Sequence, residues 1–292
     1  MAYVIRAIPV NKNFRTFAVE CRDVVEEVRK LQGLSPVASA ALGRALAGVA
    51  LLSADLKTGK ILLQISGGGP LGEILAEGDY QGNLRGTVRN PDVYLKIKGK
   101  KLPVGEAVGK NGFISVVKDL GLKEIYQSST KLVSGEIAED LAYYLTVSEQ
   151  IPSAVSLGVL VGTDGKILAA GGFLIQKLPE AKDEEIAELE EKLKNLPPIT
   201  TLLSQGKGPE EVLAMLFPDI KILEKRELRY KCTCNEERVE SMLVALGEKE
   251  LEDFIKKKEP IEVICHFCRK KYIISLERVK ELLKELKTKK KR

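Results

Sequence analysis

The feature that most constrains this chain is a set of four cysteines near its carboxyl end. They form two close pairs, Cys-Thr-Cys and Cys-His-Phe-Cys, separated by thirty residues: Cys232 and Cys234, then Cys265 and Cys268. Cysteines one or two residues apart can bind the same metal ion, and four thiolates complete a tetrahedral zinc site with no open position for water. The spacing therefore predicts a structural Zn²⁺ site, one per chain, with an iron–sulfur cluster as an alternative.

Two other residues with metal-binding chemistry need an interpretation. His266 lies between Cys265 and Cys268 and is an alternative ligand. Because four sulfurs already complete the site, we expect His266 to face solvent. Cys21, the fifth cysteine, follows a predicted strand beside apolar residues. We interpret it as a small buried side chain.

The segment that carries the cysteine pairs is small. Roughly 60 residues with few aromatic side chains make a marginal core. Apparent zinc-binding free energies of about 10–16 kcal/mol exceed the stability of so small a unit. We therefore expect residues 231–292 to fold with metal and to be largely unfolded without it. Since a metal-bound sulfur is a thiolate, the form that oxidants attack, we also expect oxidation to form local disulfides and expel the metal.

The patterns over residues 1–179 predict an α+β domain in which β-sheets pack with helices. We expect helices capped by Asp23, Ser35 and Ser134, the second of them rich in Ala and Gly and therefore buried. Alternating apolar residues predict the strands, over Tyr3–Val10, Phe14–Cys21, Ile61–Ser66, Gly72–Asp79, Asn83–Val88, Phe113–Lys118, Ser129–Val133, Ser153–Val161 and Lys166–Gln176.

A helical linker is predicted over residues 180–230. Glu184–Asn195 is a charged helix with a thin apolar stripe, and two short helical pieces follow it. Such a stripe buries little, so the linker must lie on the first domain to be ordered. Residues 231–292 are predicted to be a small zinc-binding α+β domain, in which a hairpin of Ile261–Ile264 and Tyr272–Ile274 carries the second cysteine pair.

Charge and hydropathy predict a soluble protein. The amino end lacks a basic region followed by a long apolar run, and the most apolar stretch, Val37–Ala54, is interrupted by Arg44. We expect a cytoplasmic protein whose thiols stay reduced. The net charge is +5, and much of the excess lies in a basic tail, either a solvated terminus or an arm that contacts nucleic acid: Lys287, Lys289, Lys290, Lys291 and Arg292.

A run of three glycines, Gly67–Gly69, superficially resembles a phosphate-binding loop. It has neither the helix that should follow such a loop nor its Lys-Ser/Thr ending. We interpret it as a connection between strands.

Two further motifs carry a family resemblance: Tyr144–Pro152, which is Tyr-Leu-Thr-Val-Ser-Glu-Gln-Ile-Pro, and Ala169–Pro179, which is Ala-Ala-Gly-Gly-Phe-Leu-Ile-Gln-Lys-Leu-Pro. Together with the cysteine spacing, they make the chain similar to the heat shock protein 33 family of bacteria over essentially its whole length. Members of this family are redox-regulated holdase chaperones.

The resemblance implies a cytosolic chaperone that is not an enzyme and is inactive when reduced and zinc-bound. It implies that oxidation forms the disulfides Cys232–Cys234 and Cys265–Cys268, releases zinc, unfolds the small domain and destabilises the linker. Apolar surface is then exposed, homodimers form, and unfolding client proteins are held without ATP during heat and oxidative stress.

Two other classes of function remain open. The basic tail and the cysteine turn favour a zinc-ribbon protein that binds nucleic acid, although acidic residues are interleaved with the basic ones and Phe267 is the only aromatic residue of the turn. The Cys-X-X-Cys motif is also found in thiol–disulfide oxidoreductases. Those enzymes place it at a helix start within a βαβ unit, whereas here it lies on a predicted hairpin.

Overall fold

The computed structural model describes residues 1–96, 99 and 101–289. Within it the chain forms two compact units, Met1–Lys231 and Cys232–Arg292. Lys290, Lys291 and Arg292 of the expected basic tail lie outside the described residues.

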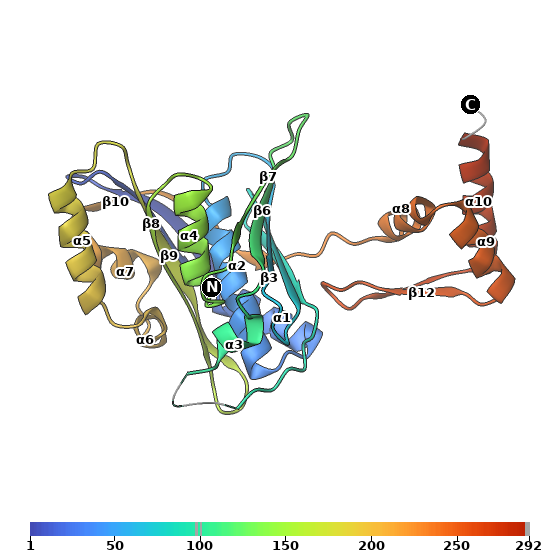
Figure 1. The fold of residues 1–292 in the computed structure, drawn as a ribbon, viewed down its shortest axis with the longest axis horizontal. Helices are drawn as coiled ribbons and strands as arrows, with labels where there is room; N and C mark the ends of the chain where they lie inside the picture. Colours follow the sequence, from blue (N-terminus) through green and yellow to red (C-terminus); the bar gives the residue numbers. More distant parts are fainter. Residues whose placement is uncertain (97–98, 100, 290–292) are drawn as a thin grey trace. The chain divides into compact units, whose positions relative to one another are not determined.

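The first unit contains an antiparallel sheet of five strands in the order β10-β1-β2-β9-β8 (Figure 1). Its strands are β1 (Tyr3–Pro9), β2 (Phe14–Glu20), β8 (Ser153–Val161), β9 (Ile167–Lys177) and β10 (Ile220–Glu227). Val4, Phe17 and Val19 are buried on one face, and Ile5 and Ala18 are buried on the other. Because side chains alternate along a strand, this sheet is covered on both faces.

A second sheet has six strands in the order β11-β5-β4-β3-β6-β7. Its strands are β3 (Lys60–Ser66), β4 (Glu73–Asp79), β5 (Asn83–Val88), β6 (Phe113–Asp119), β7 (Tyr126–Lys131) and β11 (Arg229–Tyr230). The predicted strand over Ser129–Val133 was placed too late, because pairing with β6 begins at Tyr126, opposite Lys118. The predicted α+β fold with helices packed on sheets is confirmed.

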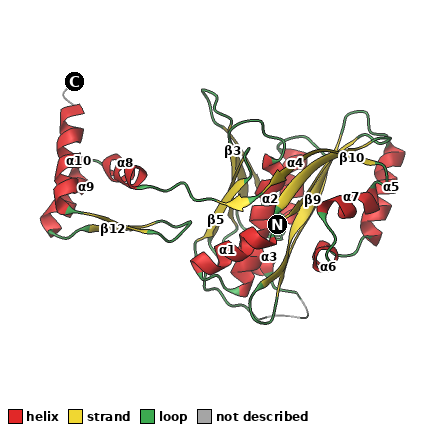
Figure 2. Cartoon of the chain, turned by 180° about the vertical axis from the view of Figure 1, so that it is seen from behind, coloured by secondary structure: helices red, strands yellow, loops and turns green. Residues whose placement is uncertain are grey.

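Helix α2 (Pro36–Ser53) lies between the two sheets (Figure 2). Ser35 caps it as predicted, accepting a hydrogen bond from the backbone N–H of Ala38, and 15 of its 18 residues are buried. Small residues permit this close approach: a Cβ atom on Gly43 would lie 2.7 Å from Val159 Cγ2.

By length and composition α2 could cross a membrane, with a mean hydropathy of 1.4. Hydropathy alone therefore did not justify rejecting the Val37–Ala54 stretch as a membrane span. However, 83% of the helix is buried inside the structure, which is typical of the core helix of a soluble domain.

Two helices begin elsewhere than the sequence predicted. Helix α1 (Arg22–Gln32) follows Cys21, so Asp23 lies in its first turn and is not its cap. Helix α4 (Ala138–Val147) begins beyond Ser134. A further short helix, α3 (Val104–Val108), lies between β5 and β6.

The start of α4 is set by a buried carboxylate. Asp140 is completely buried and accepts backbone hydrogen bonds from Val133, Ser134 and Ile137 at 2.7, 3.0 and 3.0 Å. Ile137 has a positive φ of 60°, so the chain turns sharply before the helix. Asp140 therefore fixes both the turn and the first helical residue.

The segment 180–230 contains three helices, α5 (Asp183–Asn195), α6 (Ile199–Ser204) and α7 (Pro209–Leu216). They cover the face of the first sheet opposite to α2 (Figure 1). After these helices the segment ends in strand, where β10 pairs with β1 and β11 with β5. Arg226 of β10 also donates to the carbonyl oxygens of Ser53, the last residue of α2, and of Leu56, three residues later.

The second unit is a small α+β fold with a thin core. Its elements are α8 (Glu236–Leu246), α9 (Glu248–Lys257), β12 (Ile261–Ile264), β13 (Lys271–Ile274) and α10 (Leu276–Lys289). Asn235 caps α8 by accepting from the N–H of Arg238 at 2.9 Å. Its central apolar cluster contains seven buried side chains, and Leu282 of α10 is also buried. The seven are Val239, Leu243, Leu251, Ile261, Tyr272, Ile274 and Val279.

Replacing Asp140 by alanine should destabilise the first unit by about 3 kcal/mol, because three backbone N–H groups lose a charged acceptor. Urea unfolding followed by circular dichroism measures the change. The matched control is Glu139→Ala on the same helix turn, since Glu139 is exposed and should change the free energy of unfolding by less than about 0.5 kcal/mol. Equal unfolding midpoints for the two variants would contradict the role assigned to Asp140.

Candidate metal centre

Two separate segments bring the four predicted cysteines together. Cys232 and Cys234 lie in the extended chain between β11 and α8, and Cys265 and Cys268 lie in the turn between β12 and β13. The strands of the hairpin pair from Ile261↔Ile274 to Ile264↔Lys271, which leaves the second cysteine pair at its tip. The predicted hairpin is confirmed.

Backbone hydrogen bonds shape this turn. The N–H of Cys265 donates to Lys270 O at 2.9 Å, and the N–H of Arg269 donates to Cys265 O at 2.8 Å. Arg269 has a φ of 61°, in the left-handed region. The motif therefore sits in a tight strand-to-strand turn. It does not begin a helix, as it does in the thiol–disulfide oxidoreductases.

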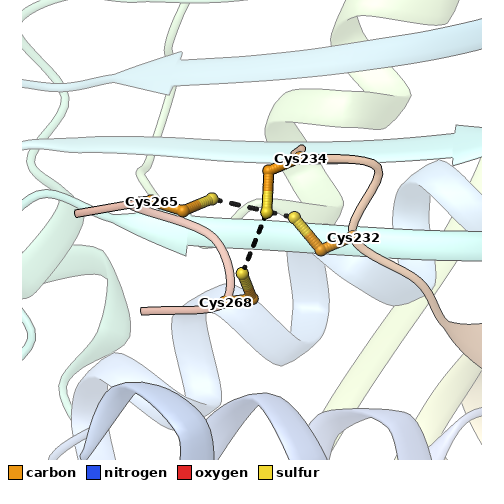
Figure 3. Close-up of side chains that lie close together, drawn as sticks. All are labelled: Cys232, Cys234, Cys265 and Cys268. Carbon is orange, nitrogen blue, oxygen red and sulfur yellow. Dashed lines mark hydrogen bonds between the residues drawn. The ribbon is translucent and has the colours of Figure 1, made fainter. Parts of the chain in front are cut away.

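The four sulfur atoms converge on one point (Figure 3). All lie within 4.8 Å of one another; Cys232 Sγ is 3.7 Å from Cys265 Sγ, and Cys234 Sγ is 3.3 Å from Cys268 Sγ. Four thiolates bound tetrahedrally at about 2.3 Å from a zinc ion would lie about 3.8 Å apart. The cysteines are free thiols with close to this spacing, so the cluster could hold a metal ion.

The other two sequence candidates lie outside the cluster. His266 is exposed, and among the described residues the group able to hold a metal consists of the four cysteines alone. Cys21 is completely buried in the first unit, where burial raises the pKa of its thiol. Both expectations for these side chains are confirmed.

Three of the thiols differ in how readily they ionise before any metal binds. Burial raises the pKa of Cys232, and it raises the pKa of Cys268 to about 12. Burial also opposes ionisation of Cys234, but hydrogen bonds from Tyr272 and the neighbouring thiols outweigh it and lower its pKa to about 7. The thiolate form is thus favoured at Cys234 more than at Cys232 or Cys268, and a bound cation would favour the ionised form of every sulfur that it contacts.

Sequence reasoning missed one residue of the site, Tyr272. Its side chain is 6% exposed, and its hydroxyl donates a hydrogen bond to Cys234 Sγ at 3.1 Å. The Lys270 ammonium lies 4.9 Å from the centre of its ring. The sequence shows a tyrosine on an alternating strand, four residues after Cys268. Only the hairpin register reveals that its side chain points toward the cysteines.

The triple glycine does not have the geometry of a phosphate-binding loop. Gly67–Gly69 joins β3 to β4, and no helix follows it. The N–H of Gly69 donates to Val108 O at 2.9 Å, and a Cβ on Gly67 would lie 2.3 Å from Gly109 O. The glycines permit close backbone packing, and the interpretation as a strand connection is confirmed.

Comparison with known proteins gives consistent matches over the whole chain. Residues 2–275 match the family model described as Hsp33 protein. The "33 kDa chaperonin" of Caldanaerobacter subterraneus subsp. tengcongensis is 46% identical over 288 residues, covering 97% of this chain and 98% of the relative. That of Bacillus subtilis is 42% identical over 285 residues, covering 97% and 98%.

The fold agrees with a solved structure of the same kind. The crystal structure of the 33 kDa chaperonin (heat shock protein 33 homologue) from Thermotoga maritima is 41% identical, with a TM-score of 0.88, and the match covers 97% of this chain and 98% of that one. With two sheets around a buried helix, a separate four-cysteine unit and these matches, the chain belongs to the Hsp33 family of chaperones.

Proposed function

We propose that this chain is a cytoplasmic, ATP-independent holdase whose activity is controlled by oxidation of its four clustered cysteines. The observation that carries the proposal is the convergence of four sulfurs in a unit that buries only eight apolar side chains among the described residues. The proposed ligands of one Zn²⁺ in the reduced, inactive form are Cys232, Cys234, Cys265 and Cys268.

Zinc bound by these thiolates would cross-link the two cysteine segments of the small unit. An apparent binding free energy of about 10–16 kcal/mol is comparable to or larger than the whole stability of a small domain. We therefore infer that residues 231–292 form a folding unit that depends on metal. The spacing of the sulfurs supports this role, since a closed four-sulfur site leaves no position for catalysis.

Oxidation is proposed to join Cys232 with Cys234 and Cys265 with Cys268. In each pair two thiolates give up two electrons, which reduce one hydrogen peroxide to two hydroxide ions, and a sulfur–sulfur bond forms. All four sulfurs lie within 4.8 Å of one another, so sequence neighbours are within reach after small movements. A disulfide sulfur is a poor metal ligand, and zinc leaves.

Unfolding of the small unit is then proposed to loosen the helices of segment 180–230. Helix α5 has thirteen residues but buries only Leu189, and α6 and α7 are shorter still. Helices of this length are marginal without tertiary packing. Their release would uncover apolar residues of the first sheet, including Ile5, Phe173 and Ile175, as a surface for unfolding clients and for a second copy of the chain.

Zinc and thiols should change together. The reduced chain should contain one zinc and four thiols that react under native conditions, because Cys21 is completely buried. After peroxide treatment both the zinc and the four thiols should be lost, and circular dichroism should show a loss of helix from the second unit. Metal analysis with a thiol-reactive dye measures this, and zinc that stays bound after all four thiols have reacted would contradict the mechanism.

Client protection should depend on the redox state. Peroxide-treated protein should suppress the aggregation of a chemically denatured client, measured by light scattering without ATP, and reduced zinc-bound protein should not. Adding dithiothreitol and zinc should restore the inactive state. Equal suppression by both forms would exclude a redox switch, although it would leave a constitutive chaperone.

Weakening the linker should partly activate the reduced chain. Leu189→Ala removes the one buried side chain of α5 and should cost about 2–3 kcal/mol of its packing. Reduced Leu189→Ala protein should therefore suppress client aggregation more than reduced wild type while retaining its zinc. The control is Glu190→Ala, since the neighbouring Glu190 is exposed. If reduced Leu189→Ala protein suppressed client aggregation no more than reduced wild type, exposure of this sheet face would not explain the activation.

A further inference from the structure

Glu210, in the first turn of α7, is bound by two strands of the first sheet. The Tyr3 hydroxyl of β1 donates to Glu210 Oε2 at 2.6 Å, and the Lys225 ammonium of β10 donates to Glu210 Oε1 at 2.9 Å. Each oxygen of one carboxylate therefore binds a different strand. We call these three side chains the Glu210 cluster.

The two strand residues of the cluster are diagonal neighbours. In the register of β1 with β10, Tyr3 stands opposite Glu227 and Ile5 stands opposite Lys225. The side chains of Tyr3 and Lys225 therefore point to the same face of the sheet, the one on which Ile5 is buried beneath α7. The Lys225 ammonium lies 3.8 Å from the centre of the Tyr3 ring, in cation–π contact.

The backbone before α7 leaves room for the Tyr3 hydroxyl. A Cβ atom on Gly208, the residue before Pro209, would lie 2.8 Å from the hydroxyl oxygen and 3.1 Å from Glu210 Oε2. A larger residue would push the hydroxyl away from the carboxylate. The start of α7 is thus shaped for this contact.

The carboxylate of Glu210 depends on its partners. Its side chain is 29% exposed, whereas that of Lys225 is 55% exposed. Burial opposes ionisation of Glu210, but hydrogen bonds from Tyr3 and Lys225 outweigh it and lower the pKa of the carboxyl. A charge that is partly withdrawn from water loses stability when a partner leaves, because solvent replaces the lost bond only in part.

We propose that Glu210 is a positioning residue that couples helix α7 to the pairing of β10 with β1, so that helix and strand open together. Helix α7 has eight residues, too few to be stable without its contacts to the sheet. When β10 separates from β1, Lys225 moves away and Glu210 keeps only the Tyr3 hydroxyl. The docking of α7 therefore weakens as β10 leaves, and a docked α7 holds β10 in place.

This coupling rests on the proposed function in one respect: release of segment 180–230 is what uncovers the surface for clients. The strand next to the cysteine unit would then also control the helix that covers Ile5. The coupling itself is a property of the reduced, zinc-loaded chain, so it can be measured without oxidant or client.

Hydrogen exchange of the full-length reduced chain, followed by mass spectrometry, tests the coupling. Glu210→Gln keeps the shape of the side chain and removes its charge. Backbone amides of both α7 and β10 should then exchange on the order of tenfold faster than in wild type, because both elements lose the same anchor.

The matched control is Glu211→Gln in the same helix turn. The Glu211 carboxylate accepts from the N–H of Gly208 at 2.8 Å, so it stabilises the start of the helix itself. This variant removes the same charge from the same helix end. Amides of α7 should exchange faster, while those of β10 should keep the wild-type rate.

A double variant shows whether Tyr3 and Glu210 act as one unit. Tyr3→Phe removes the hydroxyl and keeps the ring beneath Lys225. If the two residues act through one cluster, Tyr3→Phe with Glu210→Gln should accelerate exchange in β10 by less than the product of the two single effects.

Two results would overturn the role of Glu210. One is acceleration confined to α7 in Glu210→Gln, which is the pattern expected of Glu211→Gln. The other is a double variant whose effect equals the product of the single effects.

Client protection separates this role from the holdase function. Reduced Glu210→Gln protein should suppress client aggregation more than reduced wild type while it retains zinc. If even oxidised wild type fails to protect clients, but α7 and β10 still open together, the holdase function fails and the role of Glu210 stands.

Discussion

A unit with so few buried side chains cannot be stable through apolar burial alone, and this limit governs the carboxyl-terminal part of the molecule. Its seven core residues are grouped around a two-stranded hairpin, an arrangement that is marginal without further support. The four sulfurs lie within 4.8 Å of one another, and the metal ion proposed to bind them would supply that support. A structure held mainly by ligands at one point can lose its fold through chemistry at that point, whereas a larger core would resist it.

The first unit, by contrast, is stabilised mainly by a large buried apolar core. Helix α2 is packed between two sheets, and its small residues let both sheets approach it closely. Segment 180–230 lies between these extremes: it covers the other face of the first sheet with short helices and ends in paired strand. The chain thus runs from a large core, through short helices on a smaller second core, to a unit of minimal core. Its resistance to local opening should fall in that order.

The pairing of the four clustered cysteines, the hairpin that carries the second pair and the capping by Ser35 follow from local sequence signals, because spacing and caps are properties of neighbouring residues. Features that depend on distant contacts were missed. The start of α4 is set by a buried Asp140 and not by Ser134. Tyr272 was missed for the same reason, since its hydroxyl reaches a residue 38 positions away.

The last strands of the first unit also bear on how disorder could spread. Between Ile220 and Lys231 the chain pairs first with β1 of one sheet. It then pairs, over Arg229 and Tyr230, with β5 of the other sheet, so it connects the edges of the two sheets. The cysteine unit begins at the next residue. Unfolding that spreads from the carboxyl side reaches the two-residue pairing of β11 with β5 before the longer pairing of β10 with β1. These strand pairings can open from their ends, one residue pair at a time. Each such step breaks far fewer hydrogen bonds than separating a whole strand from its sheet.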